Sequence, residues 1–216
     1  MEIDFGFPKH LFTQHFTTSG AGEEVLTANE KLLVAGVSEK RLQDFCRGRL
    51  CAKKALGNLH QGEAEILRGT GKEPLWPEGF VGSISHAREL AGAVAARRRD
   101  LVSIGLDIEK QGRVQPNMWD MLFTPPEQDF LLGLAEARQV FYTTLFFSMK
   151  ESFYKLQYPL TGYSLWFNDV EIRHQQGQFR IVVLKDFDGK ARLPASTDLH
   201  FAHHQDQVIS VCFMEQ

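Results

Sequence analysis

The feature that most constrains the fold of this sequence is the strict alternation of apolar residues with glycine or carboxylates from residue 104 to residue 109. Successive side chains of a β-strand point to opposite faces, so this period of two predicts a strand with two unlike faces. One face would carry the apolar residues Ile104, Leu106 and Ile108, and the other would carry Gly105, Asp107 and Glu109. The fold must therefore bury one face of this strand and accommodate two neighbouring carboxylates on the other.

The carboxylate face is a candidate metal site. Mg²⁺ commonly takes one or two carboxylates together with substrate phosphates, which makes Asp107 and Glu109 candidate ligands. Gly105 has no side chain, so it would let a substrate approach the backbone beside them. The alternative is an amphipathic strand whose acidic face is only solvated.

A second pattern lies between residues 146 and 155, in a segment whose spacing predicts a helix. Glu151 and Lys155 are four residues apart, so they face the same way on a helix. As a surface ion pair they would contribute only about 0.3–0.5 kcal/mol. Aromatic residues around the pair, however, place it at the margin of a core, where a carboxylate and an amine are the groups needed beside a reacting phosphate. These aromatic residues are Phe146, Phe147, Phe153 and Tyr154.

A third pattern combines hydroxyl, imidazole and basic side chains. His86 ends a predicted strand directly after Ser83 and Ser85. Charge-assisted donors commonly gather anionic ligands, so His86 is a candidate phosphate donor, and a structural role is the alternative. The basic residues that precede it in the chain are Arg41, Arg49, Lys53 and Lys72.

Periodicity and turn residues predict an α+β protein with two similar-sized halves. Helices are predicted at residues 38–56, 118–122, 126–134 and 138–156. Strands are predicted at residues 63–68, 81–86, 91–97, 101–109, 166–173, 178–184, 198–203 and 208–213. A boundary near residues 105–115 separates an N-terminal half, residues 1–108, from a C-terminal half, residues 109–216.

Composition places the chain among ordinary globular proteins. Its 216 residues are enough to bury a sizeable core, as one large domain or two small ones. The formal net charge of -3 argues against a general nucleic-acid binder. No apolar run approaches about 18 residues and the acidic N-terminus does not look like a signal peptide, so no membrane span and a cytoplasmic location are expected. Cys46, Cys51 and Cys212 show no disulfide or zinc spacing and are expected to be buried.

Taken in order, these segments resemble the Sfp-type 4′-phosphopantetheinyl transferases, the family that activates peptide synthetases, polyketide synthases and siderophore synthetases. The matching motifs are GR at residues 48–49, GKEP at 71–74, SISH at 83–86, GLDIE at 105–109 and SMKESFYK at 148–155. The tract from residue 74 to residue 86 looks most like the enterobactin-synthetase subgroup. Two departures are Ala87, where a small polar residue is common, and residues 156–162, which lack a glycine-rich start.

The resemblance implies a fold and an activity. The expected fold has two similar α/β halves related by a pseudo-two-fold, with the active site in the cleft between them, and the expected state is a monomer. The expected enzyme is a holo-[acyl-carrier-protein] synthase that transfers the 4′-phosphopantetheine arm of coenzyme A to a serine hydroxyl of an apo carrier protein and releases 3′,5′-ADP. Its partners would be carrier proteins or carrier domains, with no nucleic acid, and its cofactors Mg²⁺ and coenzyme A.

The same resemblance implies roles for individual residues. Asp107, Glu109 and Glu151 would bind Mg²⁺ together with the coenzyme A pyrophosphate. Catalysis would rest on Asp107, Glu151 and Lys155, with Glu151 as the base for the carrier serine and Lys155 neutralising the phosphates. The coenzyme A contacts would be Arg41, Arg49, Lys72, Ser83, Ser85, His86, Asp107, Glu151 and Lys155. Glu127 matches a further acidic position near the metal, and its role stays open.

Two other functions fit some of these residues. A protein of this shape that only binds coenzyme A or 3′,5′-ADP would not need the set of Asp107, Glu109, Glu151 and Lys155. A Mg²⁺-dependent phosphohydrolase would use the same acidic strand, would need a base to position water, and would release phosphate.

Overall fold

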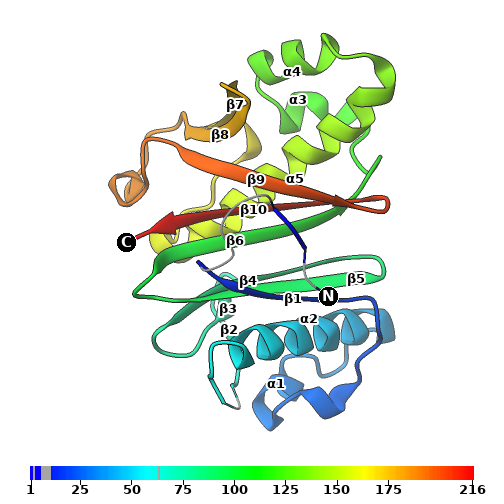
Figure 1. Cartoon of the computed structure of the whole chain (residues 1–216), viewed down its shortest axis with the longest axis vertical. Helices are drawn as coiled ribbons and strands as arrows, with labels where there is room; N and C mark the ends of the chain where they lie inside the picture. Colours follow the sequence, from blue (N-terminus) through cyan, green and yellow to red (C-terminus); the bar gives the residue numbers. More distant parts are fainter. Residues whose placement is uncertain (2, 6–10, 63) are drawn as a thin grey trace.

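The computed structural model describes residues 1, 3–5, 11–62 and 64–216 and shows two halves stacked on each other, each with one long helix and an antiparallel sheet (Figure 1). In the N-terminal half, helix α2 (Glu39–Gly57) packs against a three-stranded sheet. The strands of that sheet are β1 (Thr13–Thr17), β4 (Phe80–Ala87) and β5 (Leu90–Arg97).

In the C-terminal half, helix α5 (Glu136–Thr161) packs against a five-stranded sheet and crosses behind it in Figure 1. The strands of this sheet are β6 (Leu101–Lys110), β7 (Val170–Gln175), β8 (Gln178–Val183), β9 (Thr197–His204) and β10 (Gln207–Glu215). The smaller elements are α1 (Ala28–Leu32), β2 (Leu67–Arg68), β3 (Pro74–Leu75), α3 (Trp119–Leu122) and α4 (Pro125–Leu132). None of the helices in the described ranges is both long and apolar enough to span a membrane.

The two halves repeat one topology. Each begins with a strand, continues through its long helix, and ends with a pair of strands of which the last returns beside the first. The strand orders β1-β5-β4 and β6-β10-β9 are therefore equivalent, and β8 and β7 extend the second sheet. The expected two-half α/β fold is confirmed, and the repeated order is what a pseudo-two-fold relation requires.

Strand β6 has the two unlike faces that its sequence predicts. Ile104, Leu106 and Ile108 are at most 1% exposed and pack in one apolar cluster with residues of β5 and β10. The other face lies against α5, because Ser103 Oγ donates to the carbonyl of Leu156. The alternative of a solvated acidic face is therefore wrong, since the carboxylates on that face are enclosed between the strand and a helix.

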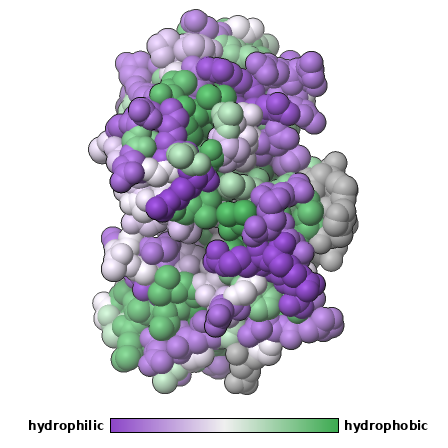
Figure 2. Space-filling view, turned by 90° about the vertical axis from the view of Figure 1, so that its left-hand side faces the viewer, coloured by the Kyte–Doolittle hydropathy of each residue, from purple (hydrophilic) through white to green (hydrophobic). Residues whose placement is uncertain are grey.

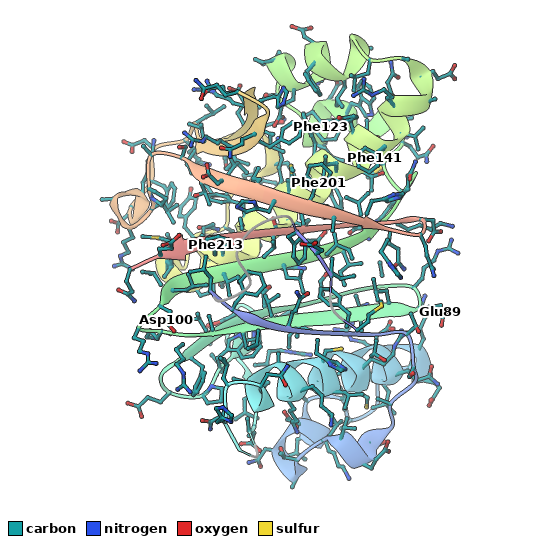
Figure 3. The ribbon with its side chains drawn as sticks, in the orientation of Figure 1. Glu89, Asp100, Phe123, Phe141, Phe201 and Phe213 are labelled. Atoms are coloured by element: carbon teal, nitrogen blue, oxygen red, sulfur yellow. The ribbon has the colours of Figure 1, made fainter. Side chains whose placement is uncertain are left out.

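The predicted helix at residues 138–156 is part of α5, which is longer at both ends. Leu145, Met149, Phe153 and Leu156 are buried on one side, as the spacing predicts. The helix ends at Gly162, whose φ of 67° is a left-handed conformation that glycine adopts without a Cβ penalty. In Figure 3 the labelled phenylalanines Phe123, Phe141 and Phe201 lie around the upper part of this helix.

Two predicted elements differ from the structure, and some observed elements were not predicted. The strand predicted at residues 63–68 is reduced to β2, and residue 63 lies outside the described part. The strand predicted at residues 166–173 starts late, because Asp169 Oδ2 accepts from the Trp166 N–H at 2.8 Å and closes a 3-10 turn at Phe167–Asp169. Strand β1 and helix α1 are additional; β1 is held by antiparallel pairing to β5, far away in sequence.

The half boundary predicted at residues 108/109 falls inside β6. Every residue of β6 that pairs in a ladder pairs with β10, so the whole strand belongs to the second sheet. We therefore propose a boundary in the turn at residues 98–100, which Asp100 marks in Figure 3, at the opposite end of β5 from Glu89. The three cysteines are free and buried, as expected.

Candidate active site

The site lies where β4 of the first sheet runs beside β6 of the second. The two strands belong to separate sheets, and hydrogen bonds that involve side chains connect them. Ser85 Oγ accepts from the Ile108 N–H at 3.1 Å, and Ser83 Oγ lies 3.5 Å from the carbonyl oxygen of Leu106. We call this junction the β4–β6 seam. It brings a hydroxyl of one half to the carboxylates of the other.

Asp107 is the centre of a buried polar network at the seam. Lys155 Nζ donates to Asp107 Oδ1 at 2.7 Å, to Ser85 Oγ at 3.0 Å and to the carbonyl of Leu106 at 3.1 Å. Ser85 Oγ also donates to Asp107 Oδ1 at 3.1 Å. The second carboxylate oxygen, Asp107 Oδ2, is buried and has no hydrogen-bond partner. An orphaned buried carboxylate oxygen is costly unless a cation or donor reaches it, so this atom marks a place for a ligand.

Two further carboxylates surround Asp107. Burial, followed by the charge of Asp107, raises the pKa of Glu109 to about 7, even though Arg113 lies 2.8 Å from its carboxylate. The pKa of Glu151 is also raised, by burial and then by Asp107. Burial is therefore the main reason that the charged forms of both glutamates are disfavoured, and the negative charge of Asp107 adds to it.

The donor chemistry of this cluster fits a hard divalent cation, because the candidate ligands are all carboxylate oxygens and one of them is orphaned. As they lie, however, no three Asp, Glu, His or Cys side chains in the described ranges are disposed to hold a metal ion. Asp107 is paired with Lys155 and Glu109 with Arg113. The predicted trio of Asp107, Glu109 and Glu151 is therefore close but not assembled, and Glu109 would have to leave Arg113 to join it.

The expected i,i+4 pair also differs. Lys155 pairs with Asp107 on the neighbouring strand, and no ion pair between it and Glu151 is recorded among the described residues. Glu151 and Lys155 are both half-buried, as the surrounding aromatic residues predict.

A basic pocket of about 610 Å³ opens on the N-terminal half, between α2, β4 and the loop that contains β3. It contains four of the predicted coenzyme A contacts, Arg41, Arg49, Lys72 and His86. The Arg49 guanidinium lies 4.4 Å from the ring centroid of Phe45, and burial lowers the pKa of Arg49 to about 10, which leaves it charged at neutral pH. Lys53 is absent from the lining, because its Nζ is turned to Glu30 at 2.6 Å.

His86 and the two serines, which form one pattern in the sequence, lie on opposite faces of strand β4. His86 lines the basic pocket, where its Nδ1 lies 3.9 Å from Asp44 Oδ2. Ser83 and Ser85 lie on the opposite face and point to β6. Ser85 therefore belongs to the Asp107 network and not to the pocket that contains Arg49.

A second pocket of about 500 Å³ lies between the two halves and adjoins the basic pocket, with which it shares Lys72, Pro74 and Ile84. Its lining includes Ser83 and, from α5, Glu151, Lys155 and the stacked pair Tyr154 and Tyr158. Figure 2 shows one face of the molecule, on which hydrophobic and strongly hydrophilic side chains alternate across the middle. Through the shared residues the basic pocket is continuous with the part of the cleft that Glu151 and Lys155 line, whereas Asp107 and Glu109 line neither pocket.

Glu127 lies outside this cleft lining and is used structurally. It is 1% exposed and forms the capping box of α4 with Thr124. Its carboxylate also accepts from Lys150 Nζ at 2.6 Å and from the Ile172 N–H at 2.7 Å. Both oxygens are therefore occupied by protein donors.

Gly105 faces a helix and not a substrate. A Cβ at this position would lie 1.8 Å from the carbonyl oxygen of Ser152 on α5, closer than any real contact. The glycine is needed because β6 and α5 touch backbone to backbone, one residue from Glu151. The expectation that a substrate approaches this backbone is wrong.

We expect Gly105→Ala to destabilise the protein by about 1–3 kcal/mol or more, since overpacking against backbone forces the helix to shift. The measurement is the free energy of unfolding from urea titration. Gly57→Ala is the matched control: nothing lies within 4 Å of its added Cβ, so the same methyl group should be neutral or slightly stabilising. Equal stability of the two variants would contradict the close contact.

Several residues at the site are not singled out by sequence patterns. Arg68 lines the basic pocket with its guanidinium 5.6 Å from the Phe45 ring centroid. Asp44 lines the same pocket, and Arg113 pairs with Glu109. Arg68 stands four residues before Lys72 and next to the GKEP motif, which is the only local signal that could have indicated it.

Comparison with known families agrees with this geometry. The 4′-phosphopantetheinyl transferase N-terminal domain family matches residues 29–96, and the 4′-phosphopantetheinyl transferase superfamily matches residues 103–212. The two matched segments meet around the turn between β5 and β6.

Among the individual relatives, two are named 4′-phosphopantetheinyl transferases and a third is an enterobactin synthase component. The chain is 38% identical over 168 residues to the 4′-phosphopantetheinyl transferase Svp of Streptomyces mobaraensis, covering 76% of this chain and 68% of that protein. It is 35% identical over 143 residues to PptT of Mycobacterium tuberculosis, covering 66% and 63%. It is 30% identical over 162 residues to enterobactin synthase component D of Salmonella austin, covering 67% and 66%. The matched region thus spans about two thirds of the length of these relatives.

Among solved structures, the holo-(acyl-carrier-protein) synthase of Bacillus anthracis in complex with CoA (3′,5′-ADP) matches 54% of this chain and 98% of that chain, at 21% identity and a TM-score of 0.42. The family assignment rests on the sequence matches, which together cover most of both halves. The chain belongs to the 4′-phosphopantetheinyl transferase superfamily.

Proposed function

We propose that this protein is a 4′-phosphopantetheinyl transferase that moves the phosphopantetheine arm of coenzyme A to a serine hydroxyl of an apo carrier protein and releases 3′,5′-ADP. The observation that carries the proposal is the single cleft that joins a basic pocket to Glu151 and Lys155, with Lys155 paired to the buried Asp107 behind it. Such a cleft suits a ligand with phosphates at two places along its length. Because the chain belongs to the 4′-phosphopantetheinyl transferase superfamily, we take this ligand to be coenzyme A.

The basic pocket is proposed to hold the 3′-phosphate and adenosine end. Arg41, Arg49, Lys72 and His86 line it and supply charge-assisted donors. The pyrophosphate would then lie at the seam, next to Asp107 and Lys155. Ser83 and Ser85 contribute by holding β4 to β6, and Ser85 also orients Asp107.

Asp107, Glu109 and Glu151 are proposed to hold Mg²⁺, which when bound would neutralise charge on the pyrophosphate. The chemical step is a displacement at phosphorus: the serine oxygen forms a bond to the β-phosphorus, and the bond from that phosphorus to 3′,5′-ADP breaks. Glu151, which lines the cleft, is proposed to accept the proton of the serine hydroxyl. Lys155 is proposed to balance the phosphate charge, and positioning of this kind accounts for most of the rate in phosphoryl transfer.

The test is the mass of an apo carrier protein after incubation with this protein, coenzyme A and Mg²⁺. A gain equal to one phosphopantetheine arm, with release of one 3′,5′-ADP, would support the transfer. Ligand binding without a mass gain would indicate a binding module. Release of inorganic phosphate would indicate a phosphohydrolase, and either result would overturn the proposal.

We expect Lys155→Ala to lower kcat by about ten- to 150-fold, the equivalent of one charge-assisted hydrogen bond, and to change KM for coenzyme A less, because the charge acts mainly in the transition state. Lys155→Arg should rescue poorly. The ammonium reaches three acceptors within 2.7–3.1 Å around one nitrogen, whereas a planar guanidinium cannot place its donors in that way. Steady-state kinetics on a carrier protein provide the measurement, and full rescue by arginine would show that only the charge matters.

A further inference from the structure

Glu30 of helix α1 is fully buried and does not line the basic pocket, but it contacts residues of the pocket wall. Its Oε2 accepts from the Thr27 N–H at 2.8 Å and from Lys53 Nζ at 2.6 Å. Its Oε1 accepts from the Ile66 N–H at 2.9 Å and lies 3.6 Å from Arg49 Nε. One carboxylate therefore contacts α1, α2 and the segment that leads into β2.

Glu30 Oε1 contacts Arg49 and the segment just before Arg68, two of the three arginines that line the pocket. Arg49 is its ion-pair partner, and Ile66 stands two residues before Arg68. Both guanidinium groups lie over the ring of Phe45, at 4.4 Å and 5.6 Å from its centroid. The two cations are thus held near each other although they repel, which lowers the pKa of Arg49 further after burial. Holding them there needs an anchored counter-charge, and Glu30 is the carboxylate at ion-pair distance from Arg49.

Arg49 itself is incompletely satisfied. It is 6% exposed, its Nε is buried without a hydrogen-bond partner, and its recorded hydrogen bond to the carbonyl of Leu67 is 3.5 Å long. A buried guanidinium with donors to spare, on the wall of an open pocket, is prepared for an anion.

We propose that Glu30 is a positioning residue that sets the preference of this pocket for a phosphate group by holding Arg49 and Arg68 side by side. The proposal rests on the proposed function, which supplies the 3′-phosphate of coenzyme A as the anion. Glu30 acts through the arginines and touches no ligand.

The substitution Glu30→Gln tests this arrangement. The carboxylate has acceptors only and faces donors on both sides, so an amide in either orientation sets an NH₂ group against a donor. Lys53→Gln is the matched control, since it breaks the same buried ion pair from the other side. It leaves Oε1, Ile66 and Arg49 unchanged, and Lys53 does not line the pocket.

The measurement is calorimetric binding of adenosine 3′,5′-bisphosphate and of 5′-AMP, which lacks the 3′-phosphate, to each full-length variant. We expect Glu30→Gln to reduce the preference for the bisphosphate about tenfold, the equivalent of one weakened charge-assisted hydrogen bond. Lys53→Gln should keep the wild-type preference although its melting temperature also falls. In an Arg49→Gln background, Glu30→Gln should cause a smaller further loss, because only the part of its effect that passes through Arg68 remains.

An unchanged or increased preference in Glu30→Gln would overturn the role of Glu30 and show that it only offsets charge. If that variant does not fold, Glu30→Asp keeps the charge but is one methylene shorter, and it should lose part of the preference; full retention would likewise overturn the role. Absence of any preference in the wild-type protein would instead overturn the proposed function of the pocket, and with it this inference.

Discussion

Replacement of Asp107 by alanine is expected to lower the rate of arm transfer by about 10²- to 10³-fold, the effect of removing one preorganised electrostatic group from an active site. Asp107 is the carboxylate that Lys155 and Ser85 share, and its second oxygen is the orphaned atom at the seam. Asp107→Asn should be almost as inactive, since the amide keeps an acceptor for Lys155 and loses the charge. Transfer to an apo carrier protein, followed by mass spectrometry over time, measures both.

Stability has to be measured alongside, because Asp107 is only 3% exposed and its loss leaves Lys155 without its partner. Asparagine is the safer variant for this reason, and both melting temperatures should be reported. Asp198→Ala is the control on the same sheet: its pair with Arg180 is half exposed, so activity should be unchanged. A near wild-type rate for folded Asp107→Asn would show that the assignment of this residue is wrong.

Replacement of Lys150 by methionine is expected to destabilise the protein by about 3–5 kcal/mol, because it leaves the carboxylate of Glu127 buried and unpaired. Lys150 is 2% exposed, and its Nζ also donates to the carbonyls of Leu122 and Phe167 at 2.9 Å each. It therefore ties α3, α4 and the 3-10 turn before β7 to α5. Urea unfolding at neutral pH gives the free energy.

The control for this variant is Arg180→Met, whose pair with Asp198 is exposed and should contribute only about 0–1 kcal/mol. The double variant Lys150→Met with Glu127→Leu should be more stable than Lys150→Met alone, since no buried charge is left unpaired. A loss below about 1 kcal/mol for Lys150→Met would contradict the structural role of the Glu127–Lys150 pair.

Local patterns were sufficient for the elements that carry the site. The alternation in β6 predicts both of its faces, and the helical spacing of Leu145, Met149 and Phe153 predicts the buried side of α5. These signals work because a strand or helix imposes its period on any sequence that must bury one face. The ordered motifs predict the family for the same reason, since each is short and contiguous.

Contacts between distant segments could not be predicted in this way. Lys155 pairs with Asp107, 48 positions earlier, instead of with Glu151 on its own helix. Gly105 fits against the backbone of α5 instead of a substrate, and β1 becomes a strand only by pairing with β5. Arg68 reaches the pocket because a buried carboxylate fixes the segment before it. Each of these outcomes depends on which elements pack together, and the periodicity of a single segment contains no information about its packing partners.

The β4–β6 seam has a consequence for motion. A backbone ladder between two strands fixes their register, because a slip breaks directional hydrogen bonds and reverses the side chains. Across the seam the halves share an apolar cluster, and the hydrogen bonds described there all involve a side chain. Apolar contacts have no preferred direction, so they oppose separation of the halves but resist sliding far less. A shear along the strands would therefore have to break only these side-chain hydrogen bonds, and it would change the distance between the basic pocket and the carboxylates while both sheets stay intact.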